Sequence, residues 1–268
     1  MTSIIEAPRT VSAALNFAAE RKQGLIWSNY SPETRTLQLQ SCAVEINDAR
    51  ALSSPPRLEK EGFEVHRMPL DAPDWTSEAY LNEVYTQKVI DFIAKRTGAP
   101  RVLTYRGNLV IRDTGDPMRA SAADFVHLDR TYASCRRLIE ASVASEIREQ
   151  YKRVVMFNIW RPLTPPPQDI PLAVCDQRTV DKADWVIGLT REPSMAQDVE
   201  HLAAVFNPAN RWYYVSGLGQ DEMVVFKGYD SDETAPMGCL HGAFKHPQVQ
   251  GAIPRASVEL RVYAFYDE

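Results

Sequence analysis

The chain has 268 residues and a formal net charge of −5, and hydrophobic residues make up 44% of it. This composition excludes a disordered or fibrous chain and fits one large globular domain or two small ones. The charge balance disfavours binding to a nucleic acid backbone. No apolar run reaches the ~18–20 residues that span a bilayer, and residues 1–17 lack the pattern of a secretory signal. We therefore expect a cytoplasmic protein with no membrane or nucleic acid partner.

The first hundred residues predict mixed structure. Spacing of apolar residues predicts a short helix over 9–21, and alternation predicts a strand over 35–46. Residues 47–62 are polar and proline-bearing, which indicates a loop. A second helix is predicted over 77–96, capped by Thr76 or Ser77 and closed by Gly98. We expect residues 1–100 to form a mixed helical layer.

From residue 101, short apolar runs recur between turn residues. A helix is predicted over 132–150 and another in the second half of 179–206. The fold class expected is mainly β with flanking helices around a double-stranded β-helix, a cupin-like jelly roll, at 101–268. No linker is visible, so we expect a single domain, 1–268. The eight predicted β segments are 101–113, 122–129, 151–163, 170–176, 211–218, 222–230, 237–244 and 256–266.

Two histidines and an aspartate form the strongest chemical pattern. His127 and Asp129 are two residues apart on a predicted strand, so their side chains share one face. His241 lies on a later predicted strand. Two imidazoles and one carboxylate on one face of an octahedral ion form the facial triad of non-heme Fe(II) oxygenases. The three open positions accommodate a bidentate 2-oxo acid and O2.

An arginine and a serine open the last predicted strand. Arg255 and Ser257 are also two residues apart and face the same way. The planar guanidinium matches a carboxylate, so both residues are candidates for binding the distal carboxylate of 2-oxoglutarate. Arg261 has the same parity and is a second candidate clamp.

The same residues admit plainer interpretations. His127 and His241 are also compatible with a core or surface position, and Asp129 with the cap of the following helix. His246 is a rival to His241, although its parity differs and Pro247 follows it. Arg255 is also compatible with a surface ion pair. We expect His201, on the predicted helix, and His66 to be structural or exposed.

Other residues are weaker candidates for contact with substrate. Asn158, Trp160 and Arg161 lie on one predicted strand, where Trp160 also suits the core and Arg161 an ion pair with Asp176. Tyr213 is predicted to face opposite to its two aromatic neighbours, Trp212 and Tyr214. Lys227 and Asp230 are expected to form a structural ion pair. The cysteines form no CxxC pair, which indicates reduced thiols: Cys42, Cys135, Cys175 and Cys239.

Several stretches resemble a known family of natural-product enzymes. They are TGAPRV (97–102), VHLD (126–129), NIWRPL (158–163), PLAVCD (171–176), DEMVVFKGYDS (221–231), HGAF (241–244) and RASVELR (255–261). The chain is similar, from about residue 65 to its C-terminus, to the hydroxylase/desaturase family associated with aspergillic acid (AsaB-like) and cephamycin (CmcJ-like) biosynthesis, which includes a gibberellin desaturase. Usual members have paired arginines near residue 112, where this chain has Arg112 alone. The resemblance implies oxidation of a small molecule in secondary metabolism with Fe(II), 2-oxoglutarate and O2.

The function expected is therefore an Fe(II)/2-oxoglutarate-dependent dioxygenase that hydroxylates or desaturates a natural-product intermediate. The metal ligands would be His127, Asp129 and His241, with Arg255 and Ser257 on the cosubstrate. Two alternatives remain: a metal-free jelly-roll protein that binds a ligand, and a zinc hydrolase that uses the same triad. We expect a monomer or a homodimer.

Overall fold

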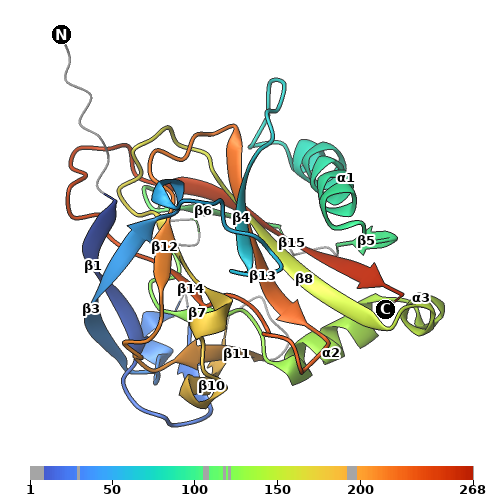
Figure 1. Cartoon of the computed structure of the whole chain (residues 1–268), viewed down its shortest axis with the longest axis horizontal. Helices are drawn as coiled ribbons and strands as arrows, with labels where there is room; N and C mark the ends of the chain where they lie inside the picture. The colour runs from blue at the N-terminus through green and yellow to red at the C-terminus, as the bar shows by residue number, and fades with distance from the viewer. Residues whose placement is uncertain are drawn as a thin grey trace.

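Two curved β-sheets face one another in this protein (Figure 1). The computed structural model describes residues 9–28, 31–104, 109–116, 119, 122–191 and 198–267. The larger sheet has the strand order β1-β3-β12-β9-β14-β7-β11-β10-β2. Its strands are β1 (Thr10–Ala18), β2 (Leu25–Trp27), β3 (Leu39–Asp48), β7 (His127–Leu128), β9 (Leu172–Cys175), β10 (Trp185–Thr190), β11 (Val199–Ala204), β12 (Trp212–Tyr214) and β14 (His241–Ala243).

The smaller sheet has the order β4-β13-β8-β15-β5, and β6 also pairs with β15. Most pairs in both sheets are antiparallel; β2 with β10 and β3 with β12 are parallel. This arrangement confirms the predicted jelly roll of mainly β class. The strands of the smaller sheet are β4 (Phe63–Arg67), β5 (Arg101–Leu103), β6 (Leu109–Asp113), β8 (Arg153–Pro162), β13 (Glu222–Asp230) and β15 (Ala256–Tyr266).

Alternation along β15 decides which side chains face the inside of the jelly roll. Val258, Leu260 and Val262 pack in the cluster that contains Val89 and Ile93 of helix α1 (Thr86–Thr97). Helix α1 therefore covers the outer face of the smaller sheet (Figure 1). Because side chains alternate along a strand, the odd-numbered residues of β15 point to the interior between the two sheets. The odd positions carry Ser257, Glu259 and Arg261, among others.

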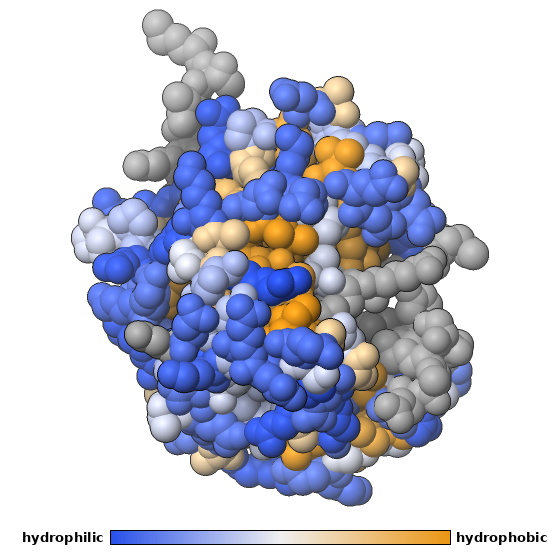
Figure 2. All heavy atoms as spheres, turned by 90° about the vertical axis from the view of Figure 1, so that its right-hand side faces the viewer, coloured by the Kyte–Doolittle hydropathy of each residue, from blue (hydrophilic) through white to orange (hydrophobic). Residues whose placement is uncertain are grey.

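Most large apolar side chains are withdrawn from the surface. Figure 2 shows one face of the molecule, which is mainly hydrophilic with hydrophobic patches between hydrophilic residues. Within the described ranges, four large hydrophobic side chains are exposed: Val84, Ile187, Phe206 and Ile253. The buried set is extensive enough to fill the space between the sheets and beneath α1.

The helix expected over residues 77–96 is confirmed. A π-helical segment, η3 (Tyr80–Tyr85), leads into α1, and the Ser77 hydroxyl accepts a hydrogen bond from the Tyr80 amide at 3.1 Å. Gly98 ends α1 with φ of 68°, a left-handed conformation that favours glycine. The helix predicted over 132–150 is divided into α2 (Tyr132–Ser142) and α3 (Ser145–Gln150). In the part of the chain that the structure describes, no helix is both long and apolar enough to cross a bilayer.

Two predicted helices are wrong. Residues 9–21 contain strand β1, in which Val11, Ala13, Leu15 and Phe17 are buried at a period of two. The spacing of Val11, Leu15 and Ala18 matched a helix by coincidence. Residues 179–206 contain β10 and β11. Four consecutive residues of β11 are buried, which removes the alternation that identifies a strand. Residues 192–197 of this segment lie outside the described residues.

Strands from the first hundred residues belong to both sheets. Strands β1, β2 and β3 pair in the larger sheet, and β4 pairs with β13 in the smaller one. The sequence predicted a mixed helical layer here because apolar and polar residues alternate clearly only over 35–46. The pairing of β1 with β3 along nine residue pairs makes the N-terminal region part of the jelly roll.

Candidate metal centre

The two histidines meet because their strands are neighbours. Strand β14 pairs antiparallel with β7, and His241 lies directly opposite His127 in the register. Opposite residues of an antiparallel pair share a face, and the two imidazole ring centroids are 4.4 Å apart. Both side chains are buried. Asp129 follows β7 two residues after His127 and therefore lies beside it.

Backbone carbonyls fix the tautomer of both imidazoles. Nδ1 of His127 donates to the carbonyl of Phe125 at 2.9 Å, and Nδ1 of His241 to that of Cys239 at 3.2 Å. Because a carbonyl only accepts, Nδ1 carries the proton and Nε2 keeps its lone pair. One ligand atom from each of His127, Asp129 and His241 lies within 4.8 Å of the others. These are the donors and the orientation that a transition-metal site requires.

Two other side chains hold the carboxylate of Asp129. Asn158 donates to Oδ2 at 2.6 Å, and Arg261 donates to Oδ2 at 3.1 Å and to Oδ1 at 2.7 Å. Burial by itself would raise the pKa of Asp129, but the Arg261 guanidinium and the imidazoles hold that pKa well below its usual range. Asp129 is therefore ionised and held in a fixed orientation.

Burial also keeps His127 neutral. It lowers the pKa of His127 well below 6.5, and the neighbouring His241 acts in the same direction. The Phe125 ring stacks on His127 with centroids 4.7 Å apart. A neutral imidazole is the form that binds a metal.

The remaining histidines lie elsewhere. His246 contacts the rings of Tyr214 and Phe244 and is not part of the triad cluster. His201 is buried on strand β11, where its Nδ1 contacts the Thr190 hydroxyl at 3.0 Å. The expectation that His201 lies on a helix is wrong, for the reason given above for β11. His66 contacts Glu64 at 2.6 Å.

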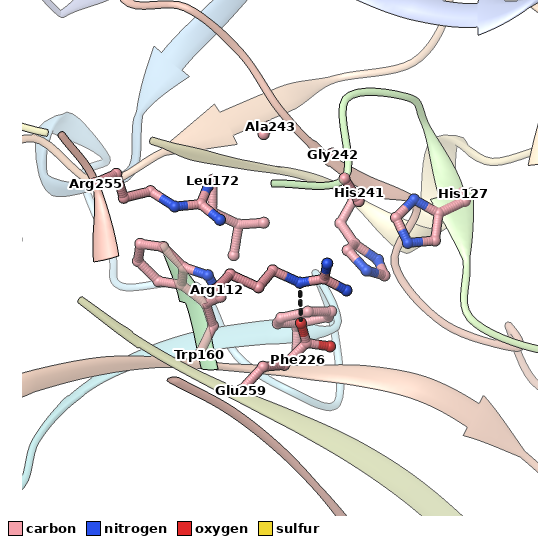
Figure 3. A pocket seen from close by; sticks show the side chains of 11 residues that line it. Arg112, His127, Trp160, Leu172, Phe226, His241, Gly242, Ala243, Arg255 and Glu259 are labelled. Atoms are coloured by element: carbon pink, nitrogen blue, oxygen red, sulfur yellow. Dashed lines mark ion pairs between the residues drawn. The ribbon is translucent and has the colours of Figure 1, made fainter. Parts of the chain in front are cut away.

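A small pocket adjoins the two imidazoles of the triad (Figure 3). Arg255 lies at one end and the two imidazoles at the other, with Trp160 along the wall. Arg255 is 2% exposed and stacks over Trp160 at 5.3 Å, so it is not in a surface ion pair. Its Nη1 donates to the Ile170 carbonyl at 2.9 Å. Its Nε and the hydroxyl of Ser257 are buried without a hydrogen-bond partner among the described residues.

Two charged residues of the pocket were not predicted. Arg112 and Glu259 both line it, and Nε of Arg112 lies 3.6 Å from Oε2 of Glu259 (Figure 3). Glu259 could have been found from the parity that it shares with Ser257 and Arg261. Arg112 lies on β6, whose register against β15 is not visible in the sequence.

The three weaker candidates on β8 lie on opposite faces of that strand. Asn158 and Trp160 point to the interior, where Asn158 holds Asp129 and Trp160 lines the pocket. Arg161 points to the other face and donates to the carbonyls of Met68 and Gln220 at 2.7 and 2.9 Å. This places Arg161 away from the pocket. Arg261 contacts the triad through Asp129 and, unlike Arg255, does not line the pocket.

Tyr213 packs against Phe63 with ring centroids 5.6 Å apart and does not line the pocket. Its predicted alternation is confirmed, because Trp212 and Tyr214 belong to a different buried cluster.

Three predicted structural contacts have a clear outcome. The ion pair of Lys227 with Asp230 is confirmed at 3.2 Å. The suggested pairing of Arg161 with Asp176 is wrong, since Asp176 pairs with Arg178 at 2.7 Å. The suggestion that Asp129 caps the next helix is also wrong. The hydroxyl of Thr131 caps α2 by accepting from the Ser134 amide.

Comparisons with known proteins agree with this site. The chain is 26% identical to the hydroxylase/desaturase efuI of Hormonema carpetanum, over 100% of this chain and 99% of that protein. It is 31% identical to the Fe(II)/2-oxoglutarate-dependent dioxygenase nvfI of Aspergillus novofumigatus, over 68% of this chain and 66% of that protein. A solved structure of the iron and alpha-ketoglutarate-dependent endoperoxidase NvfI superposes with a TM-score of 0.85 and 25% identity, covering 98% of this chain and all of that one.

A jelly roll that presents two imidazoles and one carboxylate to a shared point defines a non-heme Fe(II)- and 2-oxoglutarate-dependent oxygenase. The sequence prediction of this enzyme class is confirmed. The chain belongs to the family described as "Oxidoreductase/YMDC permease-like domain", which matches residues 9–265.

Proposed function

We propose that the chain hydroxylates or desaturates a small natural-product intermediate, with His127, Asp129 and His241 as the ligands of Fe(II). Arg255 and Ser257 bind the distal carboxylate of 2-oxoglutarate. The observation that carries this proposal is the triad itself: three buried donors from two neighbouring strands, with both imidazole tautomers fixed for metal binding. The relatives named for Fe(II)- and 2-oxoglutarate-dependent oxidation support it.

The unsatisfied polar atoms of the pocket fit a bound carboxylate. Leaving a donor such as Arg255 Nε buried without a partner is unfavourable, and the Ser257 hydroxyl lies two residues away on the same strand face. Burial lowers the pKa of Arg255 to about 10, with the neighbouring charge of Arg112 acting in the same direction. A carboxylate at this end of the pocket would satisfy both donors and neutralise the guanidinium.

The metal and the 2-oxo acid, when bound, supply the oxidising chemistry of O2. The residues of the chain hold, orient and shield these groups. Asn158 and Arg261 fix the carboxylate of Asp129, while backbone carbonyls fix the imidazoles. Trp160, Leu172 and Phe226 give the pocket an apolar wall, which limits water near the reacting centre.

Other observations support the proposed type of reaction and the proposed cell compartment. The relatives efuI and CTB9 are both named hydroxylase/desaturase, which supports hydroxylation or desaturation of the substrate. Four free cysteines, three of them buried, suit a reducing compartment such as the cytoplasm.

The zinc hydrolase alternative requires a general base next to the metal ligands. Among the residues that line the pocket, Glu259 is the candidate for this base. However, it accepts a hydrogen bond from Arg261 at 2.5 Å and pairs with Arg112. A carboxylate held between two guanidinium groups is a poor base. The binding-protein alternative predicts that ligand binding does not depend on His127.

An anaerobic titration of the metal-free protein with Fe(II) and 2-oxoglutarate tests the proposal. We expect the weak visible metal-to-ligand charge-transfer band, its loss in His241→Ala, and a higher 2-oxoglutarate concentration for half-saturation in Arg255→Ala. An iron-loaded wild-type protein that gives no band with 2-oxoglutarate would contradict the proposed mechanism.

A further inference from the structure

Arg112 lies next to the predicted cosubstrate residues because of the strand register. On β6 it is directly opposite Ser257 of β15. Opposite residues share a face, so Arg112 points into the same pocket as Ser257 and Arg255. Figure 3 shows its guanidinium group between Arg255 and the two imidazoles.

Glu259 connects Arg112 to the metal ligands. Its Oε2 is 3.6 Å from Nε of Arg112, and its Oε1 accepts from Nη2 of Arg261 at 2.5 Å. The same Nη2 donates to Asp129 at 2.7 Å. Charges therefore alternate in sign along Arg112, Glu259, Arg261 and Asp129. The side chains of all four are 9–13% exposed, so water screens them little.

Three guanidinium groups lie in or next to the pocket. Arg112 and Arg255 line it, and Arg261 lies behind Glu259 and Asp129. A bound divalent metal would add positive charge. Buried charge requires a counter-charge. A dianion with one carboxylate near Arg255 and another near the imidazoles supplies it, and Arg112 lies at the second position (Figure 3).

We propose that Arg112 binds the carboxylate of 2-oxoglutarate that adjoins the 2-oxo group, and that Glu259 is a positioning residue for both Arg112 and Arg261. This inference rests on the proposed function, since it takes 2-oxoglutarate as the ligand. Arg255, together with Ser257, then binds only the distal carboxylate. Each of the two arginines thus binds one carboxylate of the dianion.

Two 2-oxo acids separate the roles of the arginines. The probes are 2-oxoglutarate and 2-oxobutyrate, which lacks the distal carboxylate, titrated anaerobically into the Fe(II)-loaded protein. Loss of one charge-assisted hydrogen bond weakens binding by about 10- to 100-fold. Arg112→Gln should raise the Kd of both acids by a similar factor. Arg255→Gln should raise that of 2-oxoglutarate and leave that of 2-oxobutyrate nearly unchanged.

The exposed Arg101→Gln on β5 is the matched control and should leave both Kd values unchanged. Equal Kd values for wild type and Arg112→Gln with both acids would overturn the proposal. A loss in Arg112→Gln confined to 2-oxoglutarate would also overturn it, because Arg112 would then serve the distal carboxylate. A wild type without any charge-transfer band would instead contradict the proposed function.

The positioning role of Glu259 has its own readout. Glu259→Gln keeps the size of the side chain but removes the charge that orders both arginines. It should raise the Kd of 2-oxoglutarate and also the Kd of Fe(II), whereas Arg112→Gln should change only the former. Circular dichroism checks that the variants are folded. A folded Glu259→Gln protein with both wild-type affinities would overturn this role.

Discussion

A single methyl group at Gly242 should disturb the metal site without touching a ligand. A Cβ at this position would lie 2.9 Å from the carbonyl oxygen of Phe125 and 3.3 Å from its carbon. Such contacts are too short, and the neighbour is backbone, which cannot rotate away. The same carbonyl accepts the hydrogen bond from Nδ1 of His127 that fixes this imidazole. The strands β7 and β14 can therefore approach this closely only with glycine at 242.

The expected magnitude for Gly242→Ala has two parts. Overpacking of a fixed backbone contact should lower the free energy of unfolding by about 1–3 kcal/mol. Displacing the carbonyl that orients a metal-binding histidine should weaken Fe(II) binding by about 10- to 100-fold. Thermal unfolding of the metal-free protein measures the first part, and anaerobic Fe(II) titration well below the unfolding midpoint measures the second.

Gly219→Ala is the matched control. There the nearest atom to a new Cβ is the carboxylate oxygen of Asp221, at 3.0 Å on a side chain that can move. We expect wild-type Fe(II) affinity and a small change in stability. If Gly242→Ala behaved like Gly219→Ala in both assays, the close approach of β14 to Phe125 would not be what orients His127.

Two further predictions concern charged and polar contacts. Asn158→Leu should raise the Kd of Fe(II) about 10-fold in an anaerobic titration, because Asp129 loses a donor at 2.6 Å; an unchanged Kd would show that Arg261 suffices. Glu64 has a pKa of about 2: burial by itself would raise it, but hydrogen bonds from His66 and Arg96 lower it. Its stabilisation is thus complete above the unfolded pKa of about 4.3 and lost as pH falls toward 2, roughly 2–3 kcal/mol in all. Glu64→Gln should lack this part of the pH dependence in urea unfolding between pH 5 and about 2, and an unaltered profile would refute the assignment.

The sequence predicted the parts of the site that depend on local periodicity. His127 and Asp129, and likewise Arg255 and Ser257, are pairs at a spacing of two on strands, where a shared face follows from geometry. The pairing of β7 with β14 that brings His241 opposite His127 is not local. Only the order of motifs and the family resemblance indicated it.

The errors arise where burial or register hides the local signal. Strand β11 is buried at four consecutive positions, so its apolar pattern does not distinguish a strand from a helix. The position of Arg112 in the pocket depends on which residue of β15 lies opposite it on β6. The sequence alone does not specify that register. Asn158 was expected at the substrate, yet it contacts Asp129. The register of β8 against β15 places Asn158 opposite Arg261, which also donates to Asp129.

We propose above that His127, Asp129 and His241 together hold one metal ion. Iron content after anaerobic loading and desalting tests it most directly, with wild type compared with His127→Ala, Asp129→Ala, His241→Ala and the control His246→Ala. We expect close to one iron per chain in wild type and in His246→Ala, and almost none in the three triad variants. Full iron content in any folded triad variant, or its loss in His246→Ala alone, would contradict it.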